Sequence, residues 1–303
     1  MLEIKRLRLL WELQARGTVA AVAEALSYTP SAVSQQLATL EREAGIPLLR
    51  KTGRRLELTP AARALVVETE ELLAGLEGAE AALHRGHPEV SGTIRVAVFQ
   101  TAMLGVMPEV LRMLRQEFPA LRVEMVQYEP ETALRETWNR SFDLVVAEQY
   151  PEHSTAHFTG LDREILIDDP IQLGAPVTDA AHGPFAGIER LSDAADLPWV
   201  MEPHGAASRH WAEQRCRLAG FEPDVRYETP DLQAHVRLIE SGNAVAFLPG
   251  LVHGGVRPTV RRIDIDGRPH RTIFTAARES MGRHPALRAV RDAITAEARR
   301  ITE

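Results

Sequence analysis

The residues that follow Pro30 combine hydroxyl and amide side chains at helical spacing, a set that can form hydrogen bonds with DNA. Val33, Leu37 and Leu40 form the apolar stripe of this stretch, and no acidic residue occurs in its first two turns. Glutamine pairs with adenine through both amide atoms, and serine contacts phosphates or base edges. The stretch predicts a recognition helix for the major groove; the solvated face of an ordinary helical hairpin is the alternative. The face between the apolar positions consists of Ser31, Ser34, Gln35, Ala38 and Thr39.

Two short helices joined by a sharp turn must position that face. One apolar stripe ends at Leu26, residues 28–30 interrupt it, and a second stripe begins in a new phase at Val33. Thr29 suits the N-cap of the second helix. Pro30 suits its first position, because the N–H that proline lacks would have no acceptor there. The segment 18–41 therefore predicts a helix-turn-helix.

Residues 47–59 predict a basic β-hairpin directly after the helix pair. Two short strand-like runs flank Gly53, and four cationic residues accompany the turn: Arg50, Lys51, Arg54 and Arg55. Such side chains bind phosphates, and Arg is favoured in the minor groove. We expect this hairpin to act as a wing beside the helix pair; a solvated basic loop is the alternative.

The helix pair and the hairpin together resemble the LysR-type transcriptional regulators. That family carries the pattern A-x-x-L-x-x-[ST]-x-x-A-[LV]-S-x-Q-[IL]-x-x-L-E, followed by G-x-x-L-F-x-R and L-T-x-A-G. Leu49 stands where the family usually has Phe, and Ala62 where it has Gly, and neither change concerns a DNA-facing group. The residues that carry the resemblance are Ala23, Leu26, Thr29, Ala32, Val33, Ser34, Gln36, Leu37, Leu40, Glu41, Gly45, Leu48, Leu49, Arg50, Leu58, Thr59 and Ala61.

The resemblance implies which residues of the winged helix-turn-helix, residues 1–59, meet DNA. The start of the recognition helix should face bases or backbone in the groove, and the hairpin arginines should hold phosphates. The implied DNA-binding residues are Thr29, Pro30, Ser31, Ser34, Gln35, Gln36, Arg50, Arg54 and Arg55.

Length and charge indicate a protein of two parts. With 303 residues, the chain is long enough for about two domains. Residues 1–60 carry 9 Lys or Arg against 6 Asp or Glu, whereas the remainder carries 26 against 36. Phosphate would repel an acidic body, so only the N-terminal part is expected to meet nucleic acid.

Cysteine content and hydropathy indicate the compartment. Cys216 is the only cysteine, which excludes an intrachain disulfide and a thiolate metal cluster. The first residues carry charges throughout their apolar stripe, unlike a secretory signal. No apolar run reaches the ~18 residues that a bilayer requires. We therefore expect a cytoplasmic protein without a membrane partner.

Residues 60–86 predict a long helix that connects the two parts. Its apolar residues repeat every seven positions, which is typical of two paired helices; packing on its own domain is the alternative. Gly75 and Gly78 weaken the helix by up to ~1 kcal/mol each, so packing against a partner should stabilise it. Members of the LysR family dimerise through this linker helix, which favours a dimer seam. The two series are Ala62, Thr69, Leu76 and Leu83, and Leu65, Leu72 and Ala79.

Residues 90–303 predict an α/β domain, because short apolar runs alternate there with helical segments. The expected strands are 93–99, 121–126, 143–147, 171–173, 199–201, 225–227, 244–248 and 272–276, and the expected helices are 104–118, 132–139, 206–218, 232–240 and 285–300. The resemblance implies a two-lobed, periplasmic-binding-protein-like effector domain. We expect lobe I to comprise about 90–167 and 268–303, and lobe II about 168–267.

A ligand of such a domain should bind where strand ends and helix N-termini of both lobes converge. Residues 100–102 and 202–205 each lead from a strand into a helix, where free N–H groups favour an anion. Thr101 matches a position at which many family members contact the effector. A helix cap or a satisfied loop group is the alternative for each residue. The candidate effector contacts are Gln100, Thr101, Ala102, Glu129, Glu148, Gln149, Glu202, His204, Ser208, Phe247, Leu248 and Pro249.

Enzyme chemistry is poorly supported. The sequence has no G-x-S-x-G elbow, no phosphate-binding G-x-x-x-x-G-K-[ST] loop and no C-x-x-C pair. Cys216 has no evident base beside it, and His253 with two following glycines is a weak oxyanion signal. His153 and His157 have the spacing of metal ligands on a helix, but a surface loop is favoured because no third ligand is identifiable.

These observations predict a LysR-type, sequence-specific DNA-binding regulator without cofactor or enzymatic activity. Its expected partners are double-stranded DNA, a second copy or three further copies of the chain, RNA polymerase, and a small effector such as an amino acid or a carboxylate. Glu202 would suit the amine of an amino acid. Two alternatives stay open: a two-lobed small-molecule-binding protein or enzyme with an appended DNA-binding head, and an architectural DNA-binding protein without an effector.

Overall fold

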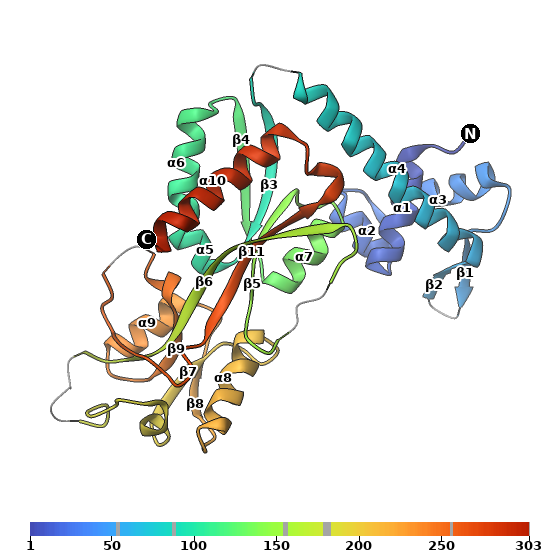
Figure 1. Ribbon diagram of the computed structural model, residues 1–303. Helices are drawn as coiled ribbons and strands as arrows, with labels where there is room; N and C mark the ends of the chain where they lie inside the picture. Colours follow the sequence, from blue (N-terminus) through green and yellow to red (C-terminus); the bar gives the residue numbers. More distant parts are fainter. Residues whose placement is uncertain (53–54, 87–88, 154–156, 178–182, 255–256, 303) are drawn as a thin grey trace. The chain divides into compact units, whose positions relative to one another are not determined.

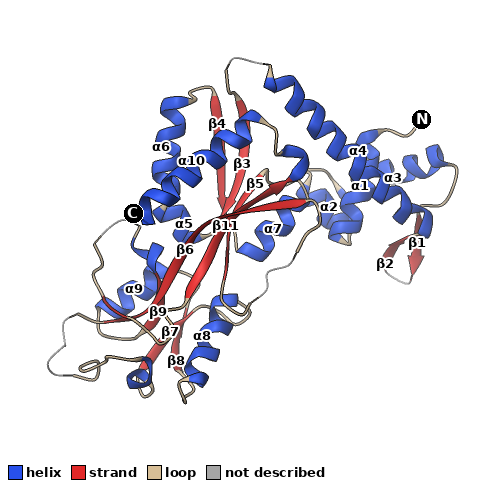
Figure 2. Ribbon diagram, viewed as in Figure 1, coloured by secondary structure: helices blue, strands red, loops and turns tan. Residues whose placement is uncertain are grey.

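The computed structural model describes residues 1–52, 55–86, 89–153, 157–177, 183–254 and 257–302 (Figures 1 and 2). The chain forms two compact units. The first comprises Met1–Pro88 with two short segments, Asn139–Ser141 and Glu279–Pro285, and the second comprises the rest.

The first unit begins with three helices that contact one another. Thr18 and Thr29 cap the second and third helices, since their hydroxyls accept the N–H groups of Ala21 and Ala32. Trp11, which is 1% exposed, lies among leucines and valines of this small core. The predicted helix-turn-helix is confirmed, with residues 26–29 between the two helices and Pro30 as the first residue of the second. The helices are α1 (Ile4–Arg16), α2 (Val19–Ala25) and α3 (Pro30–Ala44).

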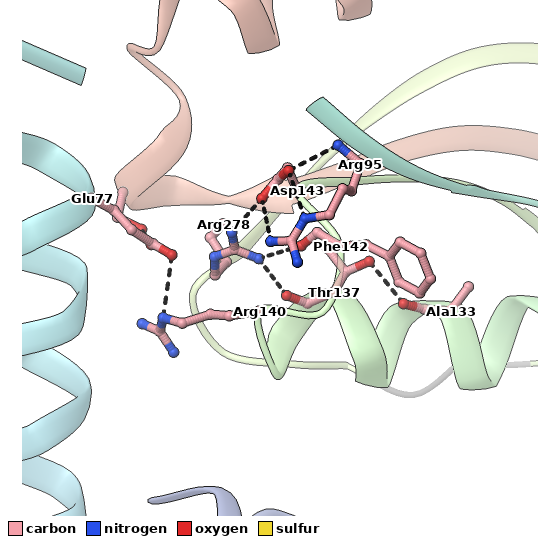
Figure 3. A network of polar contacts seen from close by, with 9 residues as sticks. Glu77, Arg95, Ala133, Thr137, Arg140, Phe142, Asp143 and Arg278 are labelled. Carbon is pink, nitrogen blue, oxygen red and sulfur yellow. Dashed lines mark hydrogen bonds and ion pairs between the residues drawn. The ribbon is translucent and has the colours of Figure 1, made fainter. Parts of the chain in front are cut away.

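The predicted hairpin and linker helix follow. Strands β1 (Leu49–Thr52) and β2 (Arg55–Leu58) pair in antiparallel register, and Thr59 then caps the 26-residue helix α4 (Pro60–Arg85). Helix α4 packs on α1. In the same unit, Glu77 of α4 forms an ion pair with Arg140 at 3.2 Å (Figure 3).

The second unit is built on a seven-stranded mixed sheet, drawn in red in Figure 2. Its path is β10-β6-β11-β5-β3-β4, and β9 pairs with β6. Strands β3, β4 and β5 are parallel, as the alternating pattern predicts, whereas β11 runs antiparallel to both neighbours. The strands are β3 (Gly92–Val98), β4 (Leu121–Gln127), β5 (Leu144–Gln149), β6 (Leu161–Ala175), β9 (Ala246–Pro249), β10 (Arg261–Ile263) and β11 (His270–Arg278).

Helices and a small second sheet complete two lobes. In lobe I, α7 packs on β3, β5 and β11, and α6 packs on β4. In lobe II, β7 (Pro198–Met201) pairs with β8 (Asp224–Glu228) in parallel. The helices are α5 (Gln100–Gly105), α6 (Met107–Glu117), α7 (Pro130–Trp138), α8 (Ala207–Leu218), α9 (Leu232–Glu240) and α10 (Pro285–Thr302), and three short 3₁₀ turns are η1 (Leu191–Ala194), η2 (Gly250–His253) and η3 (Glu279–Met281).

Two sequence-based expectations were wrong in detail. The predicted helix 104–118 is two helices, α5 and α6, because Pro108 at the start of α6 cannot donate the hydrogen bond that a continuous helix requires. Residues 168–170 were expected to separate two sets of elements, yet β6 runs through them. Beyond Pro170 the strand continues by pairing with β9 from Ile171 onward, and Ile171 also donates its N–H to the carbonyl of Pro269 at 2.8 Å.

An arginine-centred network anchors the C-terminal end of α7 (Figure 3). Arg278 of β11 donates to the carbonyls of Thr137 and Phe142 at 2.5 and 2.7 Å, and it also meets Asp143. Arg95 binds the same aspartate from β3. The network holds the C-terminal end of α7, and the first turn of this helix lies at the opposite end. Within the described ranges, every helix is too short or too polar to cross a membrane.

Candidate functional site

The exposed face of α3 has the polar character that the sequence predicts. Ser34 and Gln35 are exposed, and Ser31 lies 3.0 Å from the hydroxyl of Thr29. Thr29 also caps the helix, so it has a structural task besides any contact with DNA. Gln36 accepts a hydrogen bond from Arg6 at 2.9 Å, which fixes its amide toward α1. Pro30 is exposed at the first turn. The DNA-binding roles of these residues stay predictions.

Of the three hairpin arginines, the structure describes Arg50 and Arg55. Arg50 donates two hydrogen bonds to Glu57 on the opposite strand, at 2.9 and 3.2 Å, and its side chain is 60% exposed. An exposed pair of this kind contributes little to stability, so Arg50 can exchange Glu57 for a phosphate at small cost. Arg54 lies outside the described residues. Arg55 is the first residue of β2.

Some apolar residues of helix α4 are buried within its own unit, and others are exposed to solvent. Ala62 and Thr69 of the predicted seam are fully buried, together with Val66 and Leu73. Three other leucines of the seam are exposed, and Leu65 is half-buried. An exposed apolar stripe on a long helix is a feature that a second copy could cover. The exposed leucines are Leu72, Leu76 and Leu83.

A cavity of about 330 Å³ opens in the second unit between the start of α7, the end of β5 and the loop from β7 to α8. This volume lies within the range of small-molecule sites. Gly205 adopts φ +98° in the loop, a conformation that favours glycine. The lining residues are Glu129, Pro130, Glu131, Thr132, Glu148, Tyr150, His153, Glu202, Pro203, His204, Gly205, Ala206, Ala207, Ser208 and Pro230.

Arg271 of β11 contacts Glu148, one of the residues that line this cavity. Its side chain is 1% exposed and forms ion pairs with Glu148 and with Asp169, the latter at 2.8 Å. It also donates to the hydroxyl of Thr101 at 2.6 Å. A buried charge needs such partners, because transfer of an unpaired ion out of water costs several kcal/mol.

Burial dominates the ionisation of the cavity carboxyls. Desolvation raises the pKa of Glu148 to about 7, although the nearby Arg271 opposes the shift. Desolvation also raises the pKa of Glu202 and of Glu129, and a hydrogen bond from Ser208 opposes the shift at Glu202. Because these groups lie close enough to repel one another, the cavity favours protonation of its carboxyls.

Arg209 fixes the loop that forms the second wall. This arginine is 5% exposed, pairs with Glu213 at 2.6 Å and donates to the carbonyl of Glu202 at 3.0 Å. It also lies 3.4 Å from the ring of His204. The loop therefore presents Glu202 and Ser208 from a fixed backbone.

The structure brings five predicted effector contacts into this cavity: Glu129, Glu148, Glu202, His204 and Ser208. Phe247 lines a smaller adjoining cavity with Leu232 and His235. Gln149 lines a separate cavity of about 330 Å³ beside Arg268 and His270.

Residues 100–102 do not line the described cavities. Thr101 and Ala102 are fully buried. The side chain of Gln100 joins the start of α9, where it donates to Asp231 at 2.7 Å and accepts from the N–H of Leu232 at 2.9 Å. These contacts connect the lobes, and direct effector contact by this segment stays a prediction.

Several site residues escaped the sequence analysis. Glu131 and Thr132 lie in the first turn of a helix that was expected to begin at 132, and Tyr150 stands just past the predicted strand 143–147. Their places at element ends are a signal that could have found them. No pattern distinguishes Arg271 or Arg209 from exposed arginines, because partners far along the chain determine their burial.

The weak enzyme signals do not converge. Within the described ranges, no group of three or more His, Cys, Asp or Glu side chains could hold a metal ion. His153 lines the cavity and contacts Glu131 at 3.4 Å. Cys216 is fully buried in α8, and burial raises the pKa of its thiol to about 12, which leaves almost no reactive thiolate.

Known proteins match the chain in both parts. Residues 4–63 match the family model described as a bacterial regulatory helix-turn-helix protein of the lysR family, and residues 87–299 match the LysR substrate binding domain. The transcriptional dual regulator GltC of Bacillus subtilis is 26% identical over 82% of this chain and 81% of its own length.

Solved structures share the fold. A full-length OxyR variant from Pseudomonas aeruginosa superimposes with a TM-score of 0.67 at 17% identity, over 97% of this chain and 95% of that one. Full-length CbnR complexed with its target DNA gives a TM-score of 0.54 at 19% identity, over 98% and 100% of the two chains. Since the two family models together account for most of the sequence, the chain belongs to the LysR family of transcriptional regulators, which are DNA-binding proteins and not enzymes.

Proposed function

We propose that α3 reads the operator in the major groove. Its exposed Ser34 and Gln35 reach base edges, Ser31 and Pro30 approach the backbone, and Arg50 of the hairpin binds a phosphate. The support comes from exposure and capping: Thr29 fixes the helix start, and the apolar side chains Val33 and Leu37 hold the opposite face in the core. The exposed face of this capped helix is the observation that carries the proposal.

The effector site is the cavity between α7 and the loop from β7 to α8. Supporting observations are its volume of about 330 Å³, its place between elements of both lobes, and the fixed backbone around Glu202. A ligand bound there contacts Glu129 from one lobe and Ser208 from the other. Its affinity therefore depends on the separation of the lobes, which is the condition for a ligand to shift a conformational equilibrium.

The working form is a homodimer, or a tetramer made of two dimers, paired through the exposed stripe of α4. Leu72, Leu76 and Leu83 recur at the spacing of a helical seam, and they are exposed in the single chain. A dimer places two recognition helices on two half-sites. We assign the protein to the cytoplasm, with RNA polymerase as a further partner at the promoter.

A footprint on the DNA upstream of the gene, at low and moderate salt, tests the proposal. We expect protection of two half-sites separated by about one or more helical turns, weakened by salt because phosphate contacts release counterions. A lack of protection at every salt concentration would refute the assignment of α3.

A further inference from the structure

The effector cavity is lined by more acidic than basic side chains. Four of its lining residues are glutamates, and none of those described is Lys or Arg. The two histidines of the lining provide little positive charge for the remaining glutamates. His153 already contacts Glu131, and His204 lies beside the cationic Arg209. A ligand that enters this cavity therefore meets carboxyl groups in several directions.

The nearest buried cation is already engaged. Arg271 divides its guanidinium between Glu148, Asp169 and Thr101, so its donors point at groups of the protein. Its single positive charge faces two carboxylates at contact distance. At short range, only a hydrogen bond from the hydroxyl of Ser208 opposes the effect of desolvation on the ionised Glu202. The cavity thus retains carboxyl groups for which the described residues supply no contacting cation.

A second, independent feature lies next to these glutamates. A cavity of about 30 Å³ shares Tyr150, Glu202 and Ser208 with the larger one, and Trp211 and His235 line it. The indole N–H of Trp211, which is 3% exposed, has no hydrogen-bond partner within the described residues, and neither has Nδ1 of His235, which is 2% exposed. Buried polar atoms are rarely left in this state, so a ligand group is the natural complement.

The two atoms offer complementary chemistry. Nε2 of His235 lies 2.9 Å from the carbonyl of Thr229, so it carries the proton and donates. Nδ1 is then an acceptor, whereas the indole of Trp211 is only a donor. A hydroxyl group can satisfy both, since it donates one hydrogen bond and accepts another. A volume of about 30 Å³ holds a group of this size.

We propose that the effector is an organic cation, an amine or a guanidine whose charged group lies among Glu129, Glu148 and Glu202 and whose hydroxyl-bearing end reaches toward Trp211 and His235. This inference rests on the proposed function, because it takes the cavity to be the effector site. A carboxylate would instead bring a further negative charge beside Glu129 and Glu202, which no cation among the described residues contacts.

Calorimetry on the full-length protein with matched four-carbon compounds tests the charge. Putrescine, butylamine and aminobutanol carry cations, butanediol is neutral, and succinate and butyrate are anions. We expect the amines to bind and the neutral and anionic compounds not to bind. Affinity for the amines should rise several-fold between about pH 6 and pH 8, with proton release, because a bound cation favours ionised carboxyls.

Charge-removing variants locate the binding. Glu129→Gln and Glu202→Gln should each weaken amine binding at least tenfold, whereas Glu117→Gln, which removes an exposed carboxylate in α6 outside the cavity, should leave it unchanged. Trp211→Phe keeps an aromatic ring and removes the N–H. It should weaken aminobutanol, which has a hydroxyl, more than butylamine, which lacks one.

The outcomes separate the two proposals. Binding of succinate or butyrate but no amine, abolished by Ser208→Ala, would overturn the cationic effector and leave the cavity as the effector site. Amine binding that Glu129→Gln and Glu202→Gln do not change would place the cation elsewhere and also overturn the inference. Saturation by Mg²⁺ alone, with the same glutamate dependence, would replace the organic cation by a metal ion. No binding of any compound would contradict both proposals.

Discussion

Glu41, in the last turn of α3, accepts the backbone N–H of Leu48 at 2.9 Å, and the same carboxylate oxygen accepts the N–H of Leu49 at 3.1 Å. Leu49 is the first residue of β1. One side chain of α3 therefore fixes the start of the hairpin, so the two elements that we propose to meet DNA are joined by hydrogen bonds.

Glu41→Ala should destabilise the DNA-binding head by about 1–3 kcal/mol, because two partly buried N–H groups lose their acceptor. Native-state hydrogen exchange at the amides of α1 to α3 in the full chain measures the loss. Glu43→Ala is the matched control on the same helix. It breaks an exposed ion pair with Arg6, and such pairs contribute less than about 1 kcal/mol. Equal losses in both variants would contradict the role of Glu41.

Ser34→Ala combined with Gln35→Ala should weaken operator binding by about fivefold to a hundredfold or more, since a bidentate contact of a glutamine with a base contributes about 1–3 kcal/mol. Both side chains are exposed, so the melting temperature should stay the same. Gel-shift titration against operator and scrambled DNA measures the specific part. An unchanged ratio between the two affinities would remove these residues from base recognition.

Leu72→Glu with Leu76→Glu should convert the dimer into a monomer, because two charges would enter the apolar seam of α4. Val67→Glu is the control. Val67 is 59% exposed and lies about half a turn around the helix from Leu76. Sedimentation velocity distinguishes the states. A double variant that remains dimeric would show that another surface carries the dimer.

Glu148→Gln should change how stability depends on pH. The pKa of Glu148 is about 7 in the folded protein against a reference of 4.5, so the folded state holds the proton more tightly. Its contribution is fully present below about pH 4.5 and is lost as the pH rises to about 7.

Relative to Glu148→Gln, the wild type should therefore lose up to about 3 kcal/mol between pH 4.5 and pH 7, and nothing further above that. Urea unfolding of both proteins at several pH values gives this difference. Asp169 and Glu202, whose pKa values burial also raises, repel the Glu148 carboxylate, so the difference reports Glu148 together with its coupling to these two groups. A difference that does not vary with pH would disprove the raised pKa.

Local patterns predicted most of the fold because short-range rules determine the elements concerned. The N-cap at Thr29, the proline after it and the periodicity of α9 (Leu232–Glu240) are visible in a few neighbouring residues. The pairing of strands that lie far apart in the sequence cannot be read from neighbouring residues. Residues 161–170 mix apolar with charged side chains and were not among the predicted strands, yet pairing with β11 makes them part of β6.

The cavity was predicted in part for the same reason. Glu202 and Ser208 stand where a strand passes into a helix, which is a local signal. The burial of Arg271 depends on Glu148, Asp169 and Thr101, and these lie 102 to 170 positions away along the chain. The neutralisation of the Arg271 charge by its carboxylate partners follows only from the folded structure. In our proposal, this neutralisation determines what the cavity can bind.

Strands β6 and β11 restrict how the two lobes can move. Strand β6 pairs with β11 through residues 161–170 and with β9 and β10 through residues 171–175, so one continuous strand serves both lobes. Sliding one lobe past the other would break this ladder, whereas bending or twisting the strand pair preserves it. The motion available to a bound effector is thus a rotation about a two-stranded hinge. Gln100 joins α5 to the start of α9 away from the cavity, so such a rotation either preserves its two hydrogen bonds or must break them.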